Sequence, residues 1–79
     1  MLAEALEHLV RGIVDHPDQV RVAKRRNRRG ELLEVRVAPA DLGRVIGRGG
    51  RTARALRVVI GALSKGDDVR VDLVDTDRR

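Results

Sequence analysis

Not one of the 79 residues is Phe, Tyr, Trp or Cys. The hydrophobic share is nonetheless 42%, which is close to that of an ordinary globular protein. A folded core must therefore be built from aliphatic side chains, without disulfide bonds or thiolate metal ligands. The same absence excludes nucleic-acid-binding modules that stack bases on aromatic side chains. A chain of this length has room for one domain, which we expect to span residues 1–79 with a frayed tail over 76–79.

The N-terminal half of the chain shows one helical pattern followed by two strand patterns. Leu, Val and Ile recur at helical spacing over 2–14, so we expect an amphipathic helix there that Pro17 ends. Apolar and polar residues alternate over 20–24 and again over 33–37, which is typical of half-buried strands. The turn-forming segment 25–30 between them predicts an antiparallel hairpin with a strongly basic tip.

The C-terminal half contains two further helical patterns and one strand pattern. Pro39 suits the first turn of a helix, where Asp41 complements the positive end of the helix dipole. The glycine-rich segment 47–50 ends this helix almost at once, and a second helical pattern follows it. Alternation over 69–73 predicts a last strand, after a turn formed by 66–68. Leu42, Val45 and Ile46 share one face of the first helix. On the second helix we expect a buried stripe formed by Leu56, Val59, Ile60 and Leu63.

The predicted order is helix, strand, strand, helix, helix, strand. Strands with one apolar face and helices with apolar stripes form two layers when they bury those surfaces against one another. We therefore predict an α+β fold in which a three-stranded sheet packs against three helices. Val58 and Val74 fall outside the apolar stripes, so we expect them to be exposed and to be candidates for a dimer surface.

Basic residues are concentrated in the middle of the chain. Twelve of the 17 Lys and Arg residues, but only three of the 12 Asp and Glu residues, lie between Arg21 and Arg57. Such a region is the electrostatic footprint of a polyanionic partner. A nucleic acid fits better than a membrane surface, because no helical pattern combines a basic polar face with a bulky apolar one. We find neither a signal-peptide pattern nor an apolar run long enough to span a membrane, so we expect a cytoplasmic protein.

The segment Gly47-Arg48-Gly49-Gly50 separates two helices and has the composition of a phosphate-binding loop. Glycine allows a close approach of the backbone to a ligand and tolerates positive φ at little steric cost. The first amides of the following helix have no intrahelical partner and lie at the positive end of its dipole. Arg48 and Arg51 add cationic donors beside them. The segment is therefore suited to hold a sugar–phosphate backbone, although the same glycines would also serve a plain helix–turn–helix corner.

The segment from Leu42 to Arg51, with its apolar-Ile-Gly-x-x-Gly sequence, closely resembles the signature of the KH domain. The resemblance continues through 58–60. The predicted order of elements is similar to the type II (prokaryotic) KH topology, and the similarity covers nearly the whole chain. A free-standing domain of this size resembles the small bacterial family called KhpA or YlqC-like. The resemblance implies a protein that holds about four nucleotides of single-stranded RNA without aromatic stacking.

The same resemblance implies where the RNA would bind. Gly47–Gly50 would contact the nucleic-acid backbone, and Val45 and Ile46 would form the apolar floor of a groove for the bases. The basic turn 25–30 would lie on the other side of this groove, at the place of the KH variable loop. Because Gly49 stands where the family often has a polar or charged residue, we expect weak affinity and loose sequence preference. The candidate RNA-binding residues are Arg44, Val45, Ile46, Gly47, Arg48, Gly49, Gly50, Arg51 and Arg54, with Arg25, Arg26, Arg28 and Arg29 as variable-loop contacts.

A cellular role is also implied by the resemblance alone. KhpA-like proteins are described as RNA chaperones or post-transcriptional regulators that act with a second KH protein, the Jag-like KhpB. That complex is linked to the regulation of cell shape and the cell wall. A domain that holds about four nucleotides has little affinity of its own. Pairing with KhpB, or self-association into a homodimer, would raise that affinity through avidity.

No pattern in the sequence points to catalysis. His8 and His16 lack a neighbouring nucleophile or ligand cluster, and the C-terminal carboxylates lack the spacing of a metal-binding loop. We therefore expect no enzyme activity, small-molecule substrate, metal or cofactor. Two alternatives remain open. One is a protein-interaction subunit that dimerises and binds little RNA itself; the other is a single-stranded DNA binder, which only a preference for the 2′-hydroxyl separates from an RNA binder.

Overall fold

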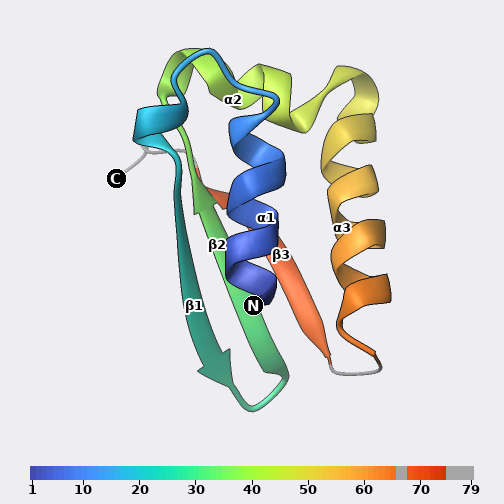
Figure 1. The fold of residues 1–79 in the computed structure, drawn as a ribbon. Helices are drawn as coiled ribbons and strands as arrows, with labels where there is room; N and C mark the ends of the chain where they lie inside the picture. Colours follow the sequence, from blue (N-terminus) through green and yellow to red (C-terminus); the bar gives the residue numbers. More distant parts are fainter. Residues whose placement is uncertain (66–67, 75–79) are drawn as a thin grey trace.

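The computed structural model describes residues 1–65 and 68–74 of the chain (Figure 1). Within these residues the elements follow the predicted order, which confirms the α+β class. Two short 3₁₀ turns, η1 and η2, interrupt the connections. The elements are α1 (Leu2–Arg11), η1 (Pro17–Gln19), β1 (Arg21–Asn27), β2 (Gly30–Arg36), α2 (Pro39–Ile46), η2 (Arg48–Gly50), α3 (Arg51–Leu63) and β3 (Val69–Val74). Apart from Asp68, the predicted turn over 66–68 and the predicted frayed tail over 76–79 lie outside the described residues.

The sheet is mixed, with the strand order β1-β2-β3. β1 and β2 form the antiparallel hairpin that the sequence predicts. β2 and β3 are parallel, which requires a long crossover connection, and α2 and α3 supply it. In Figure 1, α1 and α3 lie along one face of the sheet while α2 crosses one end. β3 is therefore an edge strand, and one side of its backbone has no strand partner among the described residues.

The core lies between the sheet and the helices and is aliphatic, as predicted. Leu33 and Val35 of β2 point towards the helices, in register with Val71 and Leu73 of β3. The residues between them, such as Glu34, point to the opposite face of the sheet because side chains alternate along a strand. The buried core residues are Leu6, Val10, Val20, Leu33, Val35, Val37, Val45, Leu56, Ile60 and Val71.

The first helix is shorter than predicted: α1 ends at Arg11 and does not continue towards Pro17. The N–H groups of Ile13 and Val14 both donate to the carbonyl of Val10, over 3.0 and 3.3 Å. The last turn therefore tightens instead of propagating. Ile13 and Val14 still pack against the core, so the helical spacing indicated their burial correctly but placed the end of the helix too late.

Both strands of the hairpin extend further towards the tip than the predicted segments 20–24 and 33–37, so that only Arg28 and Arg29 form the turn. The N–H of Arg29 donates to Oδ1 of Asn27 over 2.8 Å within this turn. Oppositely charged side chains pair across the two strands, which stabilises a ladder between residues of low strand propensity. These pairs are Arg25–Glu34, Lys24–Glu31 and Arg26–Glu31.

The buried stripe of α3 is narrower than predicted. Leu56 and Ile60 are buried together with Ala53, but Val59 and Leu63 keep 41% and 50% of their surface exposed. α3 packs against β3 on one side and against α1 on the other. Only a narrow arc of the helix therefore faces the core, and the prediction that Val59 and Leu63 are buried is wrong.

Three other apolar side chains help to define the surface. Val58 is 67% exposed, as predicted. Val74 is half-buried instead of exposed, and it lies in register with Arg36 at the end of the parallel ladder. Leu9 belongs to the predicted stripe of the first helix, yet 37% of its surface is exposed. Exposed apolar surface is thus found on α1 and α3 more than on β3.

Candidate nucleic-acid interface

The corner between α2 and α3 depends on Gly47. Its φ of 80° and ψ of 166° lie in a region that is essentially restricted to glycine. The N–H of Gly47 donates to the carbonyl of Gly43 over 2.9 Å and closes the last turn of α2. Thr52 packs directly over this corner, because a Cβ at residue 47 would lie only 2.4 Å from Thr52 Oγ1. The two helices therefore meet more closely than any residue with a side chain would allow.

We call residues Gly47–Gly50 the glycine loop. Gly49 and Gly50 also have positive φ, of 64° and 78°, and the N–H of Gly50 donates to the carbonyl of Gly47 over 3.0 Å. Nothing lies within 4 Å of the position that a Cβ would take at Gly49 or Gly50, so a ligand has room to approach the backbone there. No side chain caps the N-terminus of α3, which leaves the positive end of that helix beside the loop.

Three arginines surround the glycine loop. Arg48 lies within it, and Arg51 and Arg54 lie in the first turn of α3; all three are exposed. None of them makes an ion pair with another described residue, whereas Arg11 of α1 and Arg25 and Arg26 of the hairpin each pair with a glutamate. The loop thus combines accessible backbone amides with cations that lack a carboxylate partner in the described chain. This combination suits the binding of phosphate oxygens.

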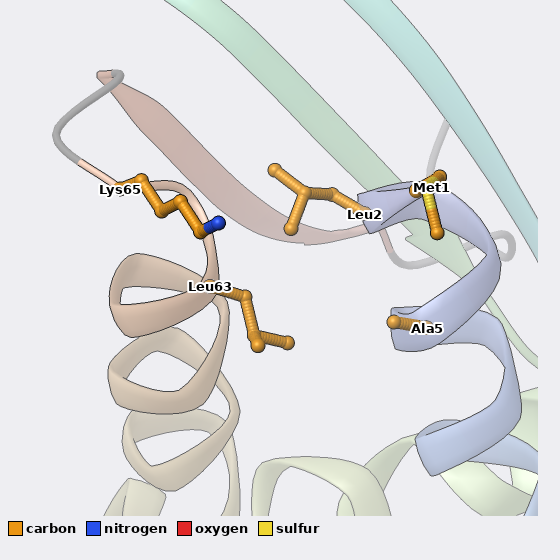
Figure 2. A pocket seen from close by; sticks show the side chains of 5 residues that line it. All are labelled: Met1, Leu2, Ala5, Leu63 and Lys65. Carbon is orange, nitrogen blue, oxygen red and sulfur yellow. The ribbon is translucent and has the colours of Figure 1, made fainter.

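The two long sides of α3 differ in their chemistry. On the side next to β3, Nε of Arg57 donates to the carbonyl of Val71 over 3.3 Å. On the side next to α1, Leu63 borders an apolar cavity of about 340 Å³ (Figure 2). Because residues three or four positions apart are neighbours on a helix surface, Arg54 and Arg57 share one side of α3. For the same reason, Val59 and Leu63 share another side. One side of α3 is therefore basic and adjoins a strand edge, and the other is apolar and adjoins a helix.

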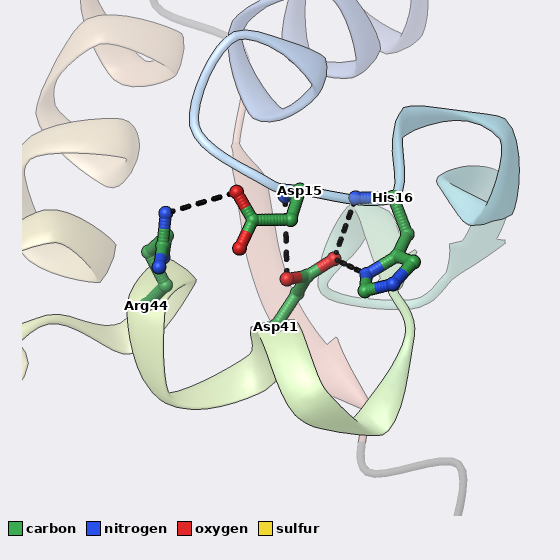
Figure 3. A network of polar contacts seen from close by, with 4 residues as sticks. All are labelled: Asp15, His16, Asp41 and Arg44. Atoms are coloured by element: carbon green, nitrogen blue, oxygen red, sulfur yellow. Dashed lines mark hydrogen bonds and ion pairs between the residues drawn. The ribbon is translucent and has the colours of Figure 1, made fainter.

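The candidate residues just before the glycine loop do not share one surface. Val45 is fully buried, so its predicted place on the floor of a base-binding groove is corrected: it supports the corner from within the core. Ile46 keeps 38% of its surface exposed and remains available. Arg44 lies about 200° around the helix from Ile46, and its guanidinium pairs with Asp15 at 3.2 Å (Figure 3). Arg44 therefore faces the connection between α1 and β1.

The tip of the β1–β2 hairpin, which the family resemblance puts across the groove from the glycine loop, lies beside the start of β3. The N–H of Glu31 donates to the carbonyl of Asp68 over 2.9 Å, which fastens the tip beside the start of β3. Along the chain, the glycine loop comes just before α3, and β3 comes after α3. The 13 residues of α3 span about 20 Å at the usual rise of a helix. In Figure 1 the tip and the loop lie at opposite ends of the molecule.

A buried carboxylate fixes the helix that leads into the glycine loop (Figure 3). Asp41 is 2% exposed. Its oxygens accept the N–H groups of Asp15 and His16 over 3.3 and 3.0 Å, and Oδ2 lies 3.0 Å from Nδ1 of His16. Burial alone would raise the pKa of Asp41, but the hydrogen bonds from His16 and from the two backbone amides hold that pKa below its ordinary value. The sequence placed Asp41 correctly in the first turn of a helix but gave no sign of these partners.

Two further findings concern only residues 1–65 and 68–74. No group of three or more His, Cys, Asp or Glu side chains is arranged there so that it could hold a metal ion. No helix in this part of the chain is long and apolar enough to cross a membrane.

Comparisons with known proteins agree with the geometry of this corner. A family model described as "KhpA/KhpB, KH domain" matches residues 3–74. The "RNA-binding protein KhpA" of Streptomyces coelicolor is 71% identical over 77 residues, which cover 98% of this chain and 96% of that protein. Proteins of the same name from Leifsonia xyli and Mycobacterium tuberculosis are 67% and 58% identical, over 95% and 99% of this chain and 99% and 96% of their own length. No solved structure matches significantly.

The names of these relatives are those of RNA-binding proteins and not of enzymes, which agrees with our expectation that the chain catalyses no reaction. The similarity extends over nearly the full length of both partners in each comparison. It includes the corner at Gly47 and the whole sheet. The chain therefore belongs to the KhpA/KhpB family of KH-domain proteins.

Proposed function

We propose that this chain binds single-stranded RNA through the glycine loop and catalyses no reaction. The observation that carries the proposal is the open space over Gly49 and Gly50, directly beside the exposed Arg48 and Arg51, which lack an acidic partner among the described residues. Phosphate oxygens would accept hydrogen bonds from the loop amides and from these arginines. The relatives named RNA-binding protein KhpA support RNA as the polyanion.

The bases would lie beside the loop and not on it. Ile46 provides exposed apolar surface next to Gly47, and Arg54 continues the row of cations along α3. Because the chain has no aromatic side chain, bases cannot stack on protein rings, and affinity must come mainly from phosphate contacts. The KH resemblance implies a site for about four nucleotides, and we expect its sequence preference to be loose.

The proposal is tested by fluorescence anisotropy with labelled single-stranded RNA at several salt concentrations. The double variant Arg48→Asp/Gly49→Asp should weaken binding at least about tenfold, because two carboxylates replace the phosphate-binding groups. Wild-type affinity should fall with salt at a log–log slope of about −0.7 for each phosphate contacted.

The chain offers a matched control, since Arg11 and Gly12 form another Arg-Gly pair, at the end of α1. The variant Arg11→Asp/Gly12→Asp makes the same change of charge outside the glycine loop and should bind RNA nearly as well as wild type. Equal binding by wild type and the loop variant, both folded by circular dichroism, would exclude the loop as the site. Parallel measurements with DNA of the same sequence decide the DNA alternative, because only RNA carries the 2′-hydroxyl.

A second surface supports assembly with another KH chain. Leu63 and Val59 of α3 are exposed, and Leu2 and Ala5 of α1 line the apolar cavity that Leu63 borders (Figure 2). Leu9 adds exposed surface on the same helix. Apolar patches of this kind on small soluble domains mark protein interfaces. We therefore place the proposed contact with a second copy, or with the KhpB/Jag-like partner that the family resemblance implies, on α1 and α3.

Replacing Leu63 with aspartate should weaken self-association roughly tenfold or more, because the carboxylate would be buried in an apolar contact. Sedimentation velocity over a range of protein concentrations measures the effect. Val58→Asp is the control, since Val58 is 67% exposed but lies on the outer side of α3. If Val58→Asp dissociates the dimer and Leu63→Asp does not, the interface lies on the outer side of the helix, as the sequence alone suggested for Val58.

The cellular role belongs to the same proposal. An RNA chaperone or post-transcriptional regulator in the cytoplasm, acting with a KhpB/Jag-like protein on cell shape and the cell wall, is what the family resemblance supports. The alternative of an interaction subunit with little RNA binding of its own predicts that binding is rescued by the partner and is insensitive to the Arg48→Asp/Gly49→Asp change.

A further inference from the structure

Among the described residues, a single hydroxyl group lies at the glycine loop. It belongs to Thr52 in the first turn of α3, and its Oγ1 is 2.4 Å from the position that a Cβ would take at Gly47. The other described side chains with a hydroxyl or a carboxamide lie in η1, in the hairpin and at the C-terminal end of α3. These are Gln19, Asn27 and Ser64.

The hydroxyl of Thr52 has no structural partner in the described part of the chain. It forms no hydrogen bond there, and no side chain caps the N-terminus of α3. No described side-chain oxygen or nitrogen is both buried and unpaired, so this hydroxyl is accessible to a ligand. Packing over Gly47 requires only the shape of a β-branched side chain, which valine would provide as well. The fold therefore gives the hydroxyl itself no role.

Thr52 lies between the two surfaces that the proposed function assigns to one nucleotide. Phosphate oxygens would bind over Gly49 and Gly50, where there is open space, and a base would lie on the exposed side chain of Ile46. Gly47, which Thr52 covers, separates these surfaces along the chain. Because the ribose joins the phosphate to the base, the sugar of this nucleotide would pass over Gly47 and meet the hydroxyl of Thr52.

A hydroxyl can recognise the sugar, whereas the other groups of the loop cannot. Arginine side chains and backbone amides only donate hydrogen bonds, and the phosphate oxygens that accept them carry no information about the sugar. The 2′-hydroxyl, which both donates and accepts, distinguishes RNA from DNA at a given site. A threonine hydroxyl also donates and accepts, so the two hydroxyls can pair in either direction.

We infer that Thr52 is the residue through which this chain prefers RNA to DNA. Its hydroxyl forms a hydrogen bond with the 2′-hydroxyl of the nucleotide whose phosphate lies at the glycine loop. The loss of one such uncharged hydrogen bond corresponds to about a fivefold change in affinity. This inference rests on the proposed function, because it assumes that the loop holds the phosphate.

The test compares labelled oligouridylate with oligodeoxyuridylate of the same length, about four nucleotides. The two share their bases and phosphates and differ only at the 2′ position. Anisotropy should show about fivefold tighter binding of the RNA by the wild-type protein. Thr52→Val, which replaces the hydroxyl with a methyl group, should lose this preference through weaker RNA binding, while its affinity for the DNA stays within about twofold of wild type.

Thr52→Ser is the matched control, because it keeps the hydroxyl and should keep the preference for RNA. Thr52→Ala removes the hydroxyl without a new methyl contact at Gly47 and should bind RNA and DNA equally. A 2′-fluoro oligouridylate keeps the sugar pucker of RNA but has no 2′ hydrogen to donate and is a poor acceptor. The wild-type protein should bind it about as weakly as it binds the DNA.

Equal binding of RNA and DNA by the wild-type protein overturns the inference. It is also overturned if Thr52→Val and Thr52→Ala keep the wild-type preference, or if 2′-fluoro and unmodified RNA bind the wild-type protein equally. Failure of the proposed function looks different: the wild-type protein would then bind no oligonucleotide, or Arg48→Asp/Gly49→Asp would bind both of them normally.

Discussion

Replacing Gly47 with alanine is expected to abolish RNA binding and to lower the free energy of unfolding by about 3 kcal/mol. Two costs combine. The backbone at residue 47 has φ of 80° and ψ of 166°, which an alanine adopts only with strain. In addition, the new Cβ would lie 2.4 Å from Thr52 Oγ1 and 2.7 Å from the Thr52 backbone nitrogen. Because the backbone nitrogen cannot move without shifting α3, the whole glycine loop must change its shape.

Urea denaturation and RNA anisotropy measure the two effects of the Gly47→Ala change. Gly43→Ala is the matched control, since nothing lies within 4 Å of its Cβ position and the residue is within α2. That control should gain up to about 1 kcal/mol of stability from helix propensity and bind RNA normally. A Gly47→Ala protein with wild-type stability and wild-type affinity would show that the corner is not as tightly packed as its contacts with Thr52 indicate.

The second large effect is expected for Asp41→Ala, which should lower the melting temperature by about 10 °C. The substitution leaves the N–H groups of Asp15 and His16 without their acceptor, and it removes the partner of the His16 ring. The connection between α1 and β1 then keeps only the exposed Asp15–Arg44 ion pair as a polar attachment to α2 among the described residues. RNA binding by the remaining folded protein should weaken as well, because α2 positions the glycine loop from its C-terminal end. Thermal melts followed by circular dichroism measure the change.

The same carboxylate should make stability depend on pH in the acid range. The native pKa of Asp41 lies below its ordinary value, so the unfolded chain binds a proton at a higher pH than the folded protein does. The stabilising contribution is therefore complete above about pH 4, the range of an unperturbed Asp, and is lost as the pH falls through the lower native pKa. Asp41→Asn should lose this part of the acid dependence. Asp18→Asn, at an exposed position, should retain it, and an unchanged acid profile in Asp41→Asn would assign the dependence to other carboxylates.

Local sequence patterns predicted the strands and the glycine corner well. The alternation in β1 and β2 follows from side chains that point to opposite faces of a sheet, and the corner follows from positive φ values that glycine favours. The order and type of these elements could therefore be predicted from the sequence. The ends of the elements were less accurate. The helical spacing of apolar residues continues through Ile13 and Val14, although α1 has already ended at Arg11. Apolar residues that are buried just after a helix can have the same spacing as residues within it.

The candidate site was predicted in part, for a related reason. The cations and glycines of the loop are adjacent in the chain, so their proximity needs no tertiary information. Val59 and Leu63 share the periodicity of Leu56, yet they are exposed because α1 covers only part of α3. The partners of Asp41 and the parallel pairing of β2 with β3 depend on contacts between distant segments. No local pattern encodes such contacts.

The parallel pairing of β2 with β3 also constrains the order in which the chain folds. The β1–β2 hairpin joins neighbouring segments and can close early, since its loop is short. Glu31 and Val69 are 38 positions apart, since 69 − 31 = 38, so β3 can dock only after α2 and α3 have formed or while they form. Because the glycine loop lies inside that crossover, it is held rigidly only once the β2–β3 ladder closes. Because β3 is also the last of these elements to be synthesised, the corner at the glycine loop is among the last parts of the molecule to be completed.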